Sequence, residues 1–451
     1  MTARPFFVEY GLLEGLEFTA PLPDAADLVV IGGGVIGVTT ALYAARAGMS
    51  VLLLEKGRVA AEQSARNWGW IRVQGRDMAE VPIALEAQAL WPALDAECGG
   101  RLGVKTVGVS YLARNDKTMA DYADWLKDAR ELGVSSRLLD AAGVRDTHRG
   151  AAAPWAGALH TPTDMRAEPW GAVPELARLA SRDGVMIREG CAVRALDIEA
   201  GRVTGVVTEA GRVKAGAVVL AGGAWSALFL RNHGVALPQL SVRSNVATTA
   251  PVAGDLQGAG VDDRLAFRRR ADGGFTLAPA AYSELYVGPD AFRALRAYLP
   301  LALEGSFDVR LRPLAPKGFP DAWGTARRWG EGQSPFERMR VLSPAPDAKR
   351  LARLRSDFMQ AFPTLGPVQL SQKWAGMIDV LPDVVPVVDH IAPLPGLIAV
   401  TGMCGHGFGI GPAFGRIAAA LAREDAPGHE LTRFRFGRFT EKASLIPGPN
   451  I

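Results

Sequence analysis

Residues 27–56, DLVVIGGGVIGVTTALYAARAGMSVLLLEK, decide the fold of this chain. An apolar stretch is followed by a cluster of glycines, by a helix-like stretch that ends at Gly48, and by a second apolar stretch that ends at Glu55. This order predicts a strand, a helix and a second strand parallel to the first, because parallel strands need a crossover connection. The stretch therefore predicts an α/β fold.

The glycines of this unit, Gly32, Gly34 and Gly37, have the spacing GxGxxG. The first permits a tight turn, the second lets the backbone approach a pyrophosphate, and the third lets helix and strand pack closely. The helix N-terminus offers free N–H groups to phosphates. Glu55 follows at about 20 residues, where an acid accepts hydrogen bonds from a ribose 2′-hydroxyl. The unit predicts an adenine dinucleotide site but does not distinguish FAD from NAD.

The composition excludes several classes of protein. A net charge of +3 over 451 residues, without a long basic run, gives no case for nucleic acid. The cysteines, Cys98, Cys191 and Cys404, form no CxxC pair, so neither a metal site nor a disulfide framework is expected. Residues 1–26 lack the pattern of a signal peptide. We expect a cytoplasmic protein, with peripheral attachment to a membrane left open.

Four further segments accompany the fingerprint. With the fingerprint counted as the first segment, the second is QSARNWGWI (63–71), the third EGCAVRALDIEAGRVTGVVTEAGRVKAGAVVLAGGAWS (189–226), the fourth LPDVVPVVD (381–389) and the fifth PGLIAVTGMCGHGFGIGPAFGR (395–416). Together the five segments resemble the FAD-dependent D-amino-acid oxidase and dehydrogenase superfamily, which includes glycine oxidase and sarcosine oxidase. The stretch 237–371 matches that superfamily poorly.

The resemblance and the pattern of strands and helices imply an α/β protein with two domains. One is a Rossmann-like FAD-binding domain with a mixed sheet, and the other is a substrate domain built on a mainly antiparallel sheet with flanking helices. The expected divisions are 27–97, 154–236 and 372–436 for the FAD-binding domain, 98–153 and 237–371 for the substrate domain, and 1–26 for a loose N-terminal extension.

The resemblance also implies where FAD is held. Ser64 is expected at the pyrophosphate, Asn67 and Gly69 near the isoalloxazine ring, and the Val193 backbone at the adenine. A glycine loop before a helix that begins at Pro412 is expected along the pyrimidine edge of the flavin, where its N–H groups stabilise negative charge. The full set of expected cofactor contacts is Gly32, Gly34, Val35, Ile36, Gly37, Glu55, Lys56, Ser64, Asn67, Trp68, Gly69, Val193, Gly222, Trp225, Gly405, His406, Gly407, Phe408 and Gly409.

Noncovalent FAD is expected. Relatives that tether the flavin use a His or Cys near the second or fourth segment, whereas the corresponding positions here hold Arg66, Asn67 and Trp68, and Met377, Ile378 and Asp379. Cys404 lies in the flavin loop but matches no tether position, and we interpret it as a small buried residue.

The expected carboxylate-binding arginine is missing. In the family an arginine just before the fourth segment holds the substrate carboxylate, and Ile378 stands there in this chain. Either Arg72 or one of Arg268, Arg269 and Arg270 replaces it, or the substrate lacks a carboxylate; the three adjacent arginines also fit a solvated basic face. Asp379 fits either a cationic substrate group or a turn cap.

The catalytic candidates are few, because hydride transfer from an amine needs mainly positioning over flavin N5. They are Arg72, His406 and Trp374. His406 fits either tuning of the flavin or a hydrogen bond to its own backbone. Trp68, Trp70 and Trp374 fit either an aromatic wall or ordinary core packing, and Tyr282 and Tyr286 are candidates for the cavity mouth.

The resemblance implies an FAD-dependent amine or amino-acid oxidase or dehydrogenase. Hydride transfer to the flavin would oxidise the C–N bond of an amino acid or secondary amine and give an imine that hydrolyses. The acceptor would be oxygen or a quinone or other electron-transfer partner, and a homo-oligomer is left open. The alternatives are a 2-hydroxy-acid dehydrogenase and the flavin subunit of an opine or sarcosine oxidase complex, with an NAD-dependent enzyme more remote.

Overall fold

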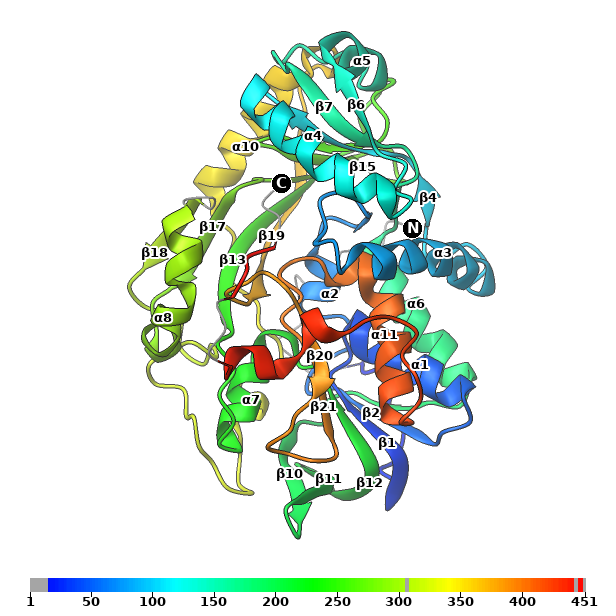
Figure 1. The fold of residues 1–451 in the computed structure, drawn as a ribbon, viewed down its shortest axis with the longest axis vertical. Coiled ribbons are helices and arrows are strands. Elements are labelled where there is room, and N and C mark those ends of the chain that lie inside the picture. Colours follow the sequence, from blue (N-terminus) through cyan, green and yellow to red (C-terminus); the bar gives the residue numbers. More distant parts are fainter. Residues whose placement is uncertain (1–14, 305–307, 442–444, 449–451) are drawn as a thin grey trace.

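The computed structural model describes residues 15–304, 308–441 and 445–448. Its backbone forms two large β-sheets with helices packed against them, and Figure 1 shows the two sheets at opposite ends of the long axis. Within the described residues, none of the helices combines the length and apolar character needed to cross a bilayer.

The first sheet has eight strands in the order β10-β11-β12-β1-β2-β9, with β21 beside β12 and β20 beside β21. Around β1 the pairing is parallel, with Ile31 opposite both Leu220 and Leu54, whereas β10, β11 and β12 are antiparallel neighbours. The parallel part is the unit that residues 27–56 predict, and the whole is the mixed sheet that the resemblance implies. The strands are β1 (Ala25–Ile31), β2 (Val51–Leu54), β9 (Met186–Arg188), β10 (Val193–Glu199), β11 (Arg202–Thr208), β12 (Gly211–Leu220), β20 (Val387–His390) and β21 (Leu397–Thr401).

A layer of helices packs on this sheet and on itself (Figure 1). Helices α1 and α11 approach closely because glycines of α11 face α1: a Cβ on Gly411 would lie 2.7 Å from Val35, and one on Gly415 would lie 2.1 Å from Thr39. The Thr39 hydroxyl also donates a 3.1 Å hydrogen bond to the Gly411 carbonyl. The helices of this layer are α1 (Val35–Arg46), α3 (Val81–Glu97), α6 (Pro169–Arg182) and α11 (Gly407–Ala422).

The second sheet has ten strands and is mainly antiparallel, as expected. Its order is β18-β17-β13-β16-β15-β14-β5-β7-β6, with β19 beside β13; only the β14–β5 and β17–β18 pairs among the described strands are parallel. The strands are β5 (Val109–Ala113), β6 (Arg137–Asp140), β7 (Gly157–Thr161), β13 (Leu240–Thr249), β14 (Ala259–Val261), β15 (Ala266–Arg269), β16 (Phe275–Ala278), β17 (Tyr282–Tyr286), β18 (Asp308–Arg312) and β19 (Leu370–Val380).

The remaining elements are short or flank the second sheet. A three-stranded sheet has β8 in its centre, and α10 packs its apolar face against the core of the second sheet. These elements are β3 (Trp70–Ile71), β4 (Lys105–Thr106), β8 (Met165–Arg166), α2 (Gln63–Arg66), α4 (Asp116–Glu131), α5 (Ala141–Thr147), α7 (Ser226–Asn232), α8 (Pro289–Glu304), α9 (Pro335–Arg338) and α10 (Ala348–Ala361).

The N-terminal segment differs from the expected loose extension where it is described. Residues 1–14 lie outside the described residues, but Thr19 forms a β-bridge with Arg188 at the edge of the first sheet. The backbone N–H groups of Glu17 and Phe18 both donate to the Glu189 carboxylate, at 2.9 and 3.1 Å. Backbone donors and a buried Phe18 therefore hold this stretch against the sheet.

Candidate cofactor and substrate site

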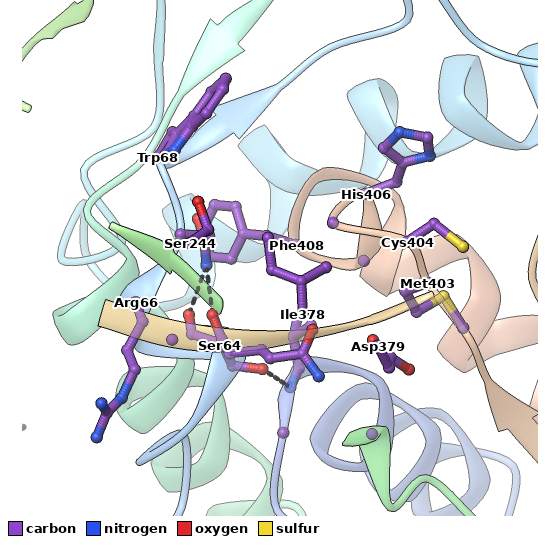
Figure 2. Close-up of a pocket in the computed structure, with 18 of the residues that line it drawn as sticks. Ser64, Arg66, Trp68, Ser244, Ile378, Asp379, Met403, Cys404, His406 and Phe408 are labelled. Carbon is purple, nitrogen blue, oxygen red and sulfur yellow. Dashed lines mark hydrogen bonds between the residues drawn. The ribbon is translucent and has the colours of Figure 1, made fainter. Parts of the chain in front are cut away.

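One cavity of about 720 Å³ runs through the molecule where the two sheets meet. At one end it is lined by Ile31, Leu54 and Leu220, the last residues of three neighbouring strands of the first sheet. The carboxyl ends of strands are where α/β sheets bind ligands. The other end lies between segment 66–72, strand β19 and the start of α11, which Figure 2 shows surrounding a common space.

The glycines of the fingerprint are required by close contacts. A Cβ on Gly32 would lie 2.4 Å from the Ala221 carbonyl oxygen, and Gly32 has a φ of +111°. A Cβ on Gly37 would lie 1.9 Å from the Gly32 carbonyl oxygen, so helix and strand touch there. Gly32, Gly34, Val35 and Ile36 line the cavity, and Gly37 lies behind it.

Glu55 lies at the end of β2, beside the fingerprint turn. Its carboxylate accepts hydrogen bonds from the backbone N–H of Gly33, at 2.8 Å, and of Gly57, at 2.7 Å. Burial raises the pKa of Glu55 to about 6, although Lys56 and the two N–H groups act in the other direction. Glu55 therefore braces the glycine turn and still lines the cavity, where an acceptor for a ribose hydroxyl is expected.

Ser64 closes the N-terminus of α1. Its hydroxyl oxygen accepts a 2.9 Å hydrogen bond from the backbone nitrogen of Val35, the first residue of that helix. Asn67 then fixes the following turn: its side chain donates to the Ser64 carbonyl at 2.9 Å and accepts from Gly69 N–H at 2.8 Å. Ser64, Asn67 and Trp68 line the cavity, whereas Gly69 lies behind it with a φ of +79°.

Lys56 and Trp225 line the cavity as part of a neutralised group with Glu62. Lys56 forms a 2.6 Å ion pair with Glu62 and lies 4.5 Å above the Trp225 ring. The Trp225 ring N–H donates to the same carboxylate at 3.1 Å. Val193 and Gly222 line this part of the cavity too. Sequence reasoning missed Glu62, although its position six residues after Lys56 is close enough in the chain to pair with it.

The expected glycine loop at 405–409 is partly helical, so the helix start predicted at Pro412 is wrong. Helix α11 begins at Gly407, with His406 at its N-cap position. Glycines here serve close packing within a helix: a Cβ on Gly409 would lie 2.8 Å from the Trp70 carbonyl oxygen. Gly405 to Gly409 all line the cavity, so the first turn of α11 is presented to it.

His406 makes no hydrogen bond through Nδ1 to any described residue, so a bond from that atom to its own backbone is excluded. The nearest acid is Glu80, whose Oε2 lies 3.8 Å from Nδ1. Burial, and then the charges of Arg76 and Arg72, hold the pKa of His406 well below its usual range. The imidazole is therefore neutral, and Figure 2 shows it directed away from Ile378 and Asp379.

Ile378 lines the cavity without a charge, at the position where the family has its arginine. The neighbouring Asp379 is 1% exposed and accepts hydrogen bonds from the Gln239 amide, at 3.0 Å, and from Gly402 N–H, at 2.8 Å. Burial raises the pKa of Asp379. Asp379 thus ties β19 to the chain before α11, and it also lines the cavity.

Several candidates lie outside the cavity. Trp374 is buried and donates its ring N–H to the Arg66 carbonyl at 3.0 Å. Arg268 is fully buried and binds the Glu168 carboxylate with two nitrogens at 3.0 and 3.1 Å, so the solvated basic face is wrong. Tyr282 packs against Arg350, 3.4 Å from its ring centroid, and does not reach the cavity, nor does Tyr286.

Cys404 lines the cavity and is only partly buried, so the expected small buried residue is wrong, and its sulfur is held by the backbone. Its sulfur accepts from Leu381 N–H at 3.3 Å and donates to the Gly402 carbonyl at 3.1 Å. Burial, and then Asp379, hold the pKa of the thiol well above its usual range. A protonated, engaged thiol is a poor nucleophile.

Sequence reasoning missed further residues that line the substrate end. Arg76, Tyr111, Tyr122 and Val261 line the cavity there with the predicted Arg72. Residues 72–80 form turns rather than a helix, so the four-residue spacing of Arg72, Arg76 and Glu80 gave no signal that their side chains meet.

The residues present fit FAD. The glycine turn, the N-terminus of α1 and the Glu55 carboxylate provide the contacts of a dinucleotide cradle. The same cavity is also lined by the first turn of α11, so it offers space beyond the cradle for the flavin half of the cofactor. A volume of about 720 Å³ lies within the range of cofactor sites.

Comparisons with known proteins agree with this geometry. A D-amino acid dehydrogenase of Methylobacterium sp. (strain 4-46) is 30% identical over 378 residues, which cover 66% of this chain and 88% of the relative. The structure of the L-amino acid deaminase of Proteus myxofaciens with anthranilate has a TM-score of 0.89 and 28% identity, covering 94% of this chain and 96% of the other. Human mitochondrial sarcosine dehydrogenase is 28% identical over 250 residues, 52% of this chain, and the match spans about a quarter (26%) of its length.

The family model described as FAD dependent oxidoreductase matches residues 27–421. The match includes the fingerprint, both sheets and α11, so the resemblance deduced from five segments and the α/β fold class are confirmed. This chain belongs to the DAO family of FAD-dependent oxidoreductases.

Proposed function

We propose that this chain oxidises the C–N bond of an amino acid or secondary amine with noncovalently bound FAD, and releases an imine that hydrolyses. The observation that carries the proposal is the single cavity that joins the dinucleotide cradle to the first turn of α11. A cofactor held at Gly34 and Ser64 would extend to Trp68 and Ile378, where an amine has room beside it.

FAD supplies the hydride acceptor when bound. The chain's own residues bind the cofactor and orient it toward the substrate. The N–H groups at the start of α1 favour the pyrophosphate, and Glu55 accepts from the ribose. The first turn of α11 would offer its N–H groups and positive dipole end to the negative charge of a reduced flavin. The rings of Trp68 and Phe408 line the same end of the cavity and would help to exclude water from it.

The noncovalent mode is supported by residue chemistry. Neither 66–68 nor 377–379 contains a histidine or cysteine, and the Cys404 thiol is engaged by Leu381 and Gly402. The names of the relatives, which include a D-amino acid dehydrogenase and an L-amino acid deaminase, support an amino acid as substrate. We propose oxygen or an electron-transfer partner as the acceptor.

The test is an anaerobic titration of the purified chain. We expect a yellow protein whose flavin is released by acid denaturation, and whose visible flavin band is bleached by one class among D-amino acids, L-amino acids and secondary amines. Products should contain ammonia or a shortened amine in proportion to bleaching. Bleaching by 2-hydroxy acids alone would contradict amine oxidation, and a flavin that stays in the precipitate would contradict noncovalent binding.

A further inference from the structure

A cluster of polar side chains, three of them buried and two half-buried, adjoins the substrate end of the cavity. We call Arg72, Arg76, Glu80, Asp164 and His406 the polar cluster. Arg76 and Glu80 have side chains only 2% and 1% exposed, and Asp164 is fully buried. Arg72 and Arg76 line the cavity, as does His406. Charged groups are rarely buried to this degree without complete pairing.

The hydrogen bonding of the polar cluster is incomplete. Among the described residues, Arg76 Nη1, both carboxylate oxygens of Glu80 and His406 Nδ1 find no hydrogen-bond partner. The Glu80 Oε2 atom lies 3.8 Å from Arg76 Nη1 and 3.8 Å from His406 Nδ1, beyond hydrogen-bond distance. The other bonds of the Arg76 guanidinium, to the carbonyls of Arg72 and His406, are long at 3.4 Å. A buried donor left unpaired is destabilising, so a further partner is expected at Arg76.

The polar cluster lies next to the place where the flavin ring is proposed. A Cβ on Gly409 would lie 3.4 Å from the backbone nitrogen of Arg72, so Arg72 follows directly beside the first turn of α11. Less polar side chains line the same part of the cavity, namely those of Tyr111, Tyr122 and Val261. The Arg72 guanidinium carbon lies 5.4 Å from the Tyr111 ring centroid.

The charges of the polar cluster favour an entering anion. Burial raises the pKa values of Glu80 and Asp164 to about 7 each, against the opposing effect of the two arginines. Arg76 is permanently charged near neutral pH, since burial and then Arg72 lower its pKa only to about 10. His406 is neutral. Asp77 and Arg433 also act on Glu80, and because their charges have opposite signs, their effects on the pKa of Glu80 oppose each other. Burial thus disfavours the charged forms of both acids, while Arg76 stays charged, so the arginines are available to an anion that enters from the cavity.

We propose that Arg72 and Arg76 form the carboxylate subsite of the substrate, in place of the arginine that Ile378 replaces, and that Glu80 is the positioning residue for Arg76. The inference rests on the proposed function. Two guanidinium groups can bind a carboxylate through several charge-assisted hydrogen bonds, and the unpaired Nη1 of Arg76 gains its partner from the ligand. The substrate is then an α-amino acid, or an N-substituted one, rather than a plain amine.

The experiment compares two probes on the FAD-bound protein. Anthranilate carries a carboxylate beside an aromatic amine, and aniline is the same molecule without the carboxylate; binding is followed by the change in the flavin spectrum. We expect anthranilate to bind the wild type at least 30-fold more tightly than aniline. Arg76→Met and Arg72→Met should each raise the Kd of anthranilate by 10- to 100-fold, and each should change the Kd of aniline by less than threefold.

Two further variants separate positioning from binding, and one serves as a matched control. Glu80→Gln should raise the Kd of anthranilate and the KM of any amino-acid substrate by about 10-fold while changing kcat less than threefold, whereas Glu80→Asp should recover part of the loss. Arg114→Met removes an arginine that lines the same cavity but is already paired with Asp262 and Asp263, so it should change anthranilate binding less than threefold.

The outcomes are distinguishable from those of the proposed function. Equal binding of anthranilate and aniline by the wild type, or unchanged anthranilate binding in Arg72→Met and Arg76→Met, would overturn the subsite and leave water as the partner of Arg76. If Arg76→Met fails to hold FAD, anthranilate binding by Arg72→Met and Glu80→Gln tests the subsite instead. If anthranilate responds as expected but no amine bleaches the flavin, the subsite stands and the proposed function fails.

Discussion

The hydroxyl oxygen of Ser64 lies 2.9 Å from the backbone nitrogen of Val35, the first residue of helix α1. Ser64 comes from a different segment, 29 residues further along the chain, and a Cβ on Gly34 would lie 3.1 Å from the same oxygen. The pyrophosphate cradle is therefore built by two segments that hold each other, and neither forms it alone.

Ser64→Ala should weaken FAD binding by about 10-fold and lower the stability of the apoprotein by about 1 kcal/mol, because the cap of α1 is lost. Ser64→Thr keeps the hydroxyl, so this variant should retain most of the FAD affinity and most of the apoprotein stability. Titration of apoprotein with FAD, followed by flavin fluorescence, and urea unfolding measure the two effects. Equal FAD affinity in the Ala and Thr variants would show that Ser64 has no part in the cradle.

Gly37→Ala should destabilise the protein by at least about 2 kcal/mol, because the added methyl group would lie 1.9 Å from the Gly32 carbonyl oxygen. Gly171→Ala is the matched control: it lies in helix α6, and nothing lies within 4 Å of its added Cβ. The free energy of unfolding of that variant should rise by about 0.5–1 kcal/mol, because alanine has a higher helix propensity than glycine. Thermal unfolding compares them, and a Gly37→Ala protein as stable as wild type would disprove the close helix–strand contact.

Glu55 makes stability and FAD binding depend on pH in opposite directions. Its folded-state pKa of about 6 exceeds the ordinary value of 4.5, so the folded apoprotein binds the proton more tightly than the unfolded chain does. Apoprotein stability should therefore fall as pH rises from about 4.5 to 6, by at most about 2 kcal/mol. FAD affinity should rise over the same range, because the ionised carboxylate is the better acceptor for the ribose.

Glu55→Gln provides the control for both effects. Denaturant unfolding and FAD titrations between pH 4.5 and 7 should show a flatter dependence in the Gln variant than in the wild type. Parallel pH profiles in the two proteins would mean that another group is responsible.

Trp374→Phe should leave the flavin spectrum and activity nearly unchanged, because the indole lies outside the cavity. The substitution should lower the free energy of unfolding by about 1 kcal/mol, because the hydrogen bond to the Arg66 carbonyl is lost. Trp68→Phe, by contrast, changes a residue that lines the cavity and should alter the flavin absorption band. Absorption spectra and unfolding curves of the two variants decide; a shifted band in Trp374→Phe alone would reverse this assignment.

The local features of the fold could be predicted from the sequence because they depend on neighbours in the chain. Residues 27–56 carry the turn, the helix and both strands in one stretch, and the structure forms them within a few residues of the expected bounds. The start of α11 could not be predicted. Its glycines are typical of a loop, and only the approach of Trp70 and Val35 explains why a helix needs them.

Charged residues were harder to predict, because burial is a tertiary property. Three consecutive arginines suggested a solvated face, yet Arg268 is fully buried against Glu168, 100 residues earlier in the chain. Likewise, nothing local to Arg76 and Glu80 shows that both side chains are enclosed. The missing arginine at Ile378 was visible in the sequence, but its replacement depended on which segments meet around the cavity.

A crystal structure of the purified chain with FAD would show where the cofactor lies and whether it is bonded to the protein. We expect a pyrophosphate at Gly34 and Ser64, a ribose at Glu55, and the isoalloxazine ring beside residues 405–409 with no covalent bond to the protein. A flavin whose ring lies away from the first turn of α11, or a cavity closed by protein side chains in a colourless crystal, would contradict this expectation.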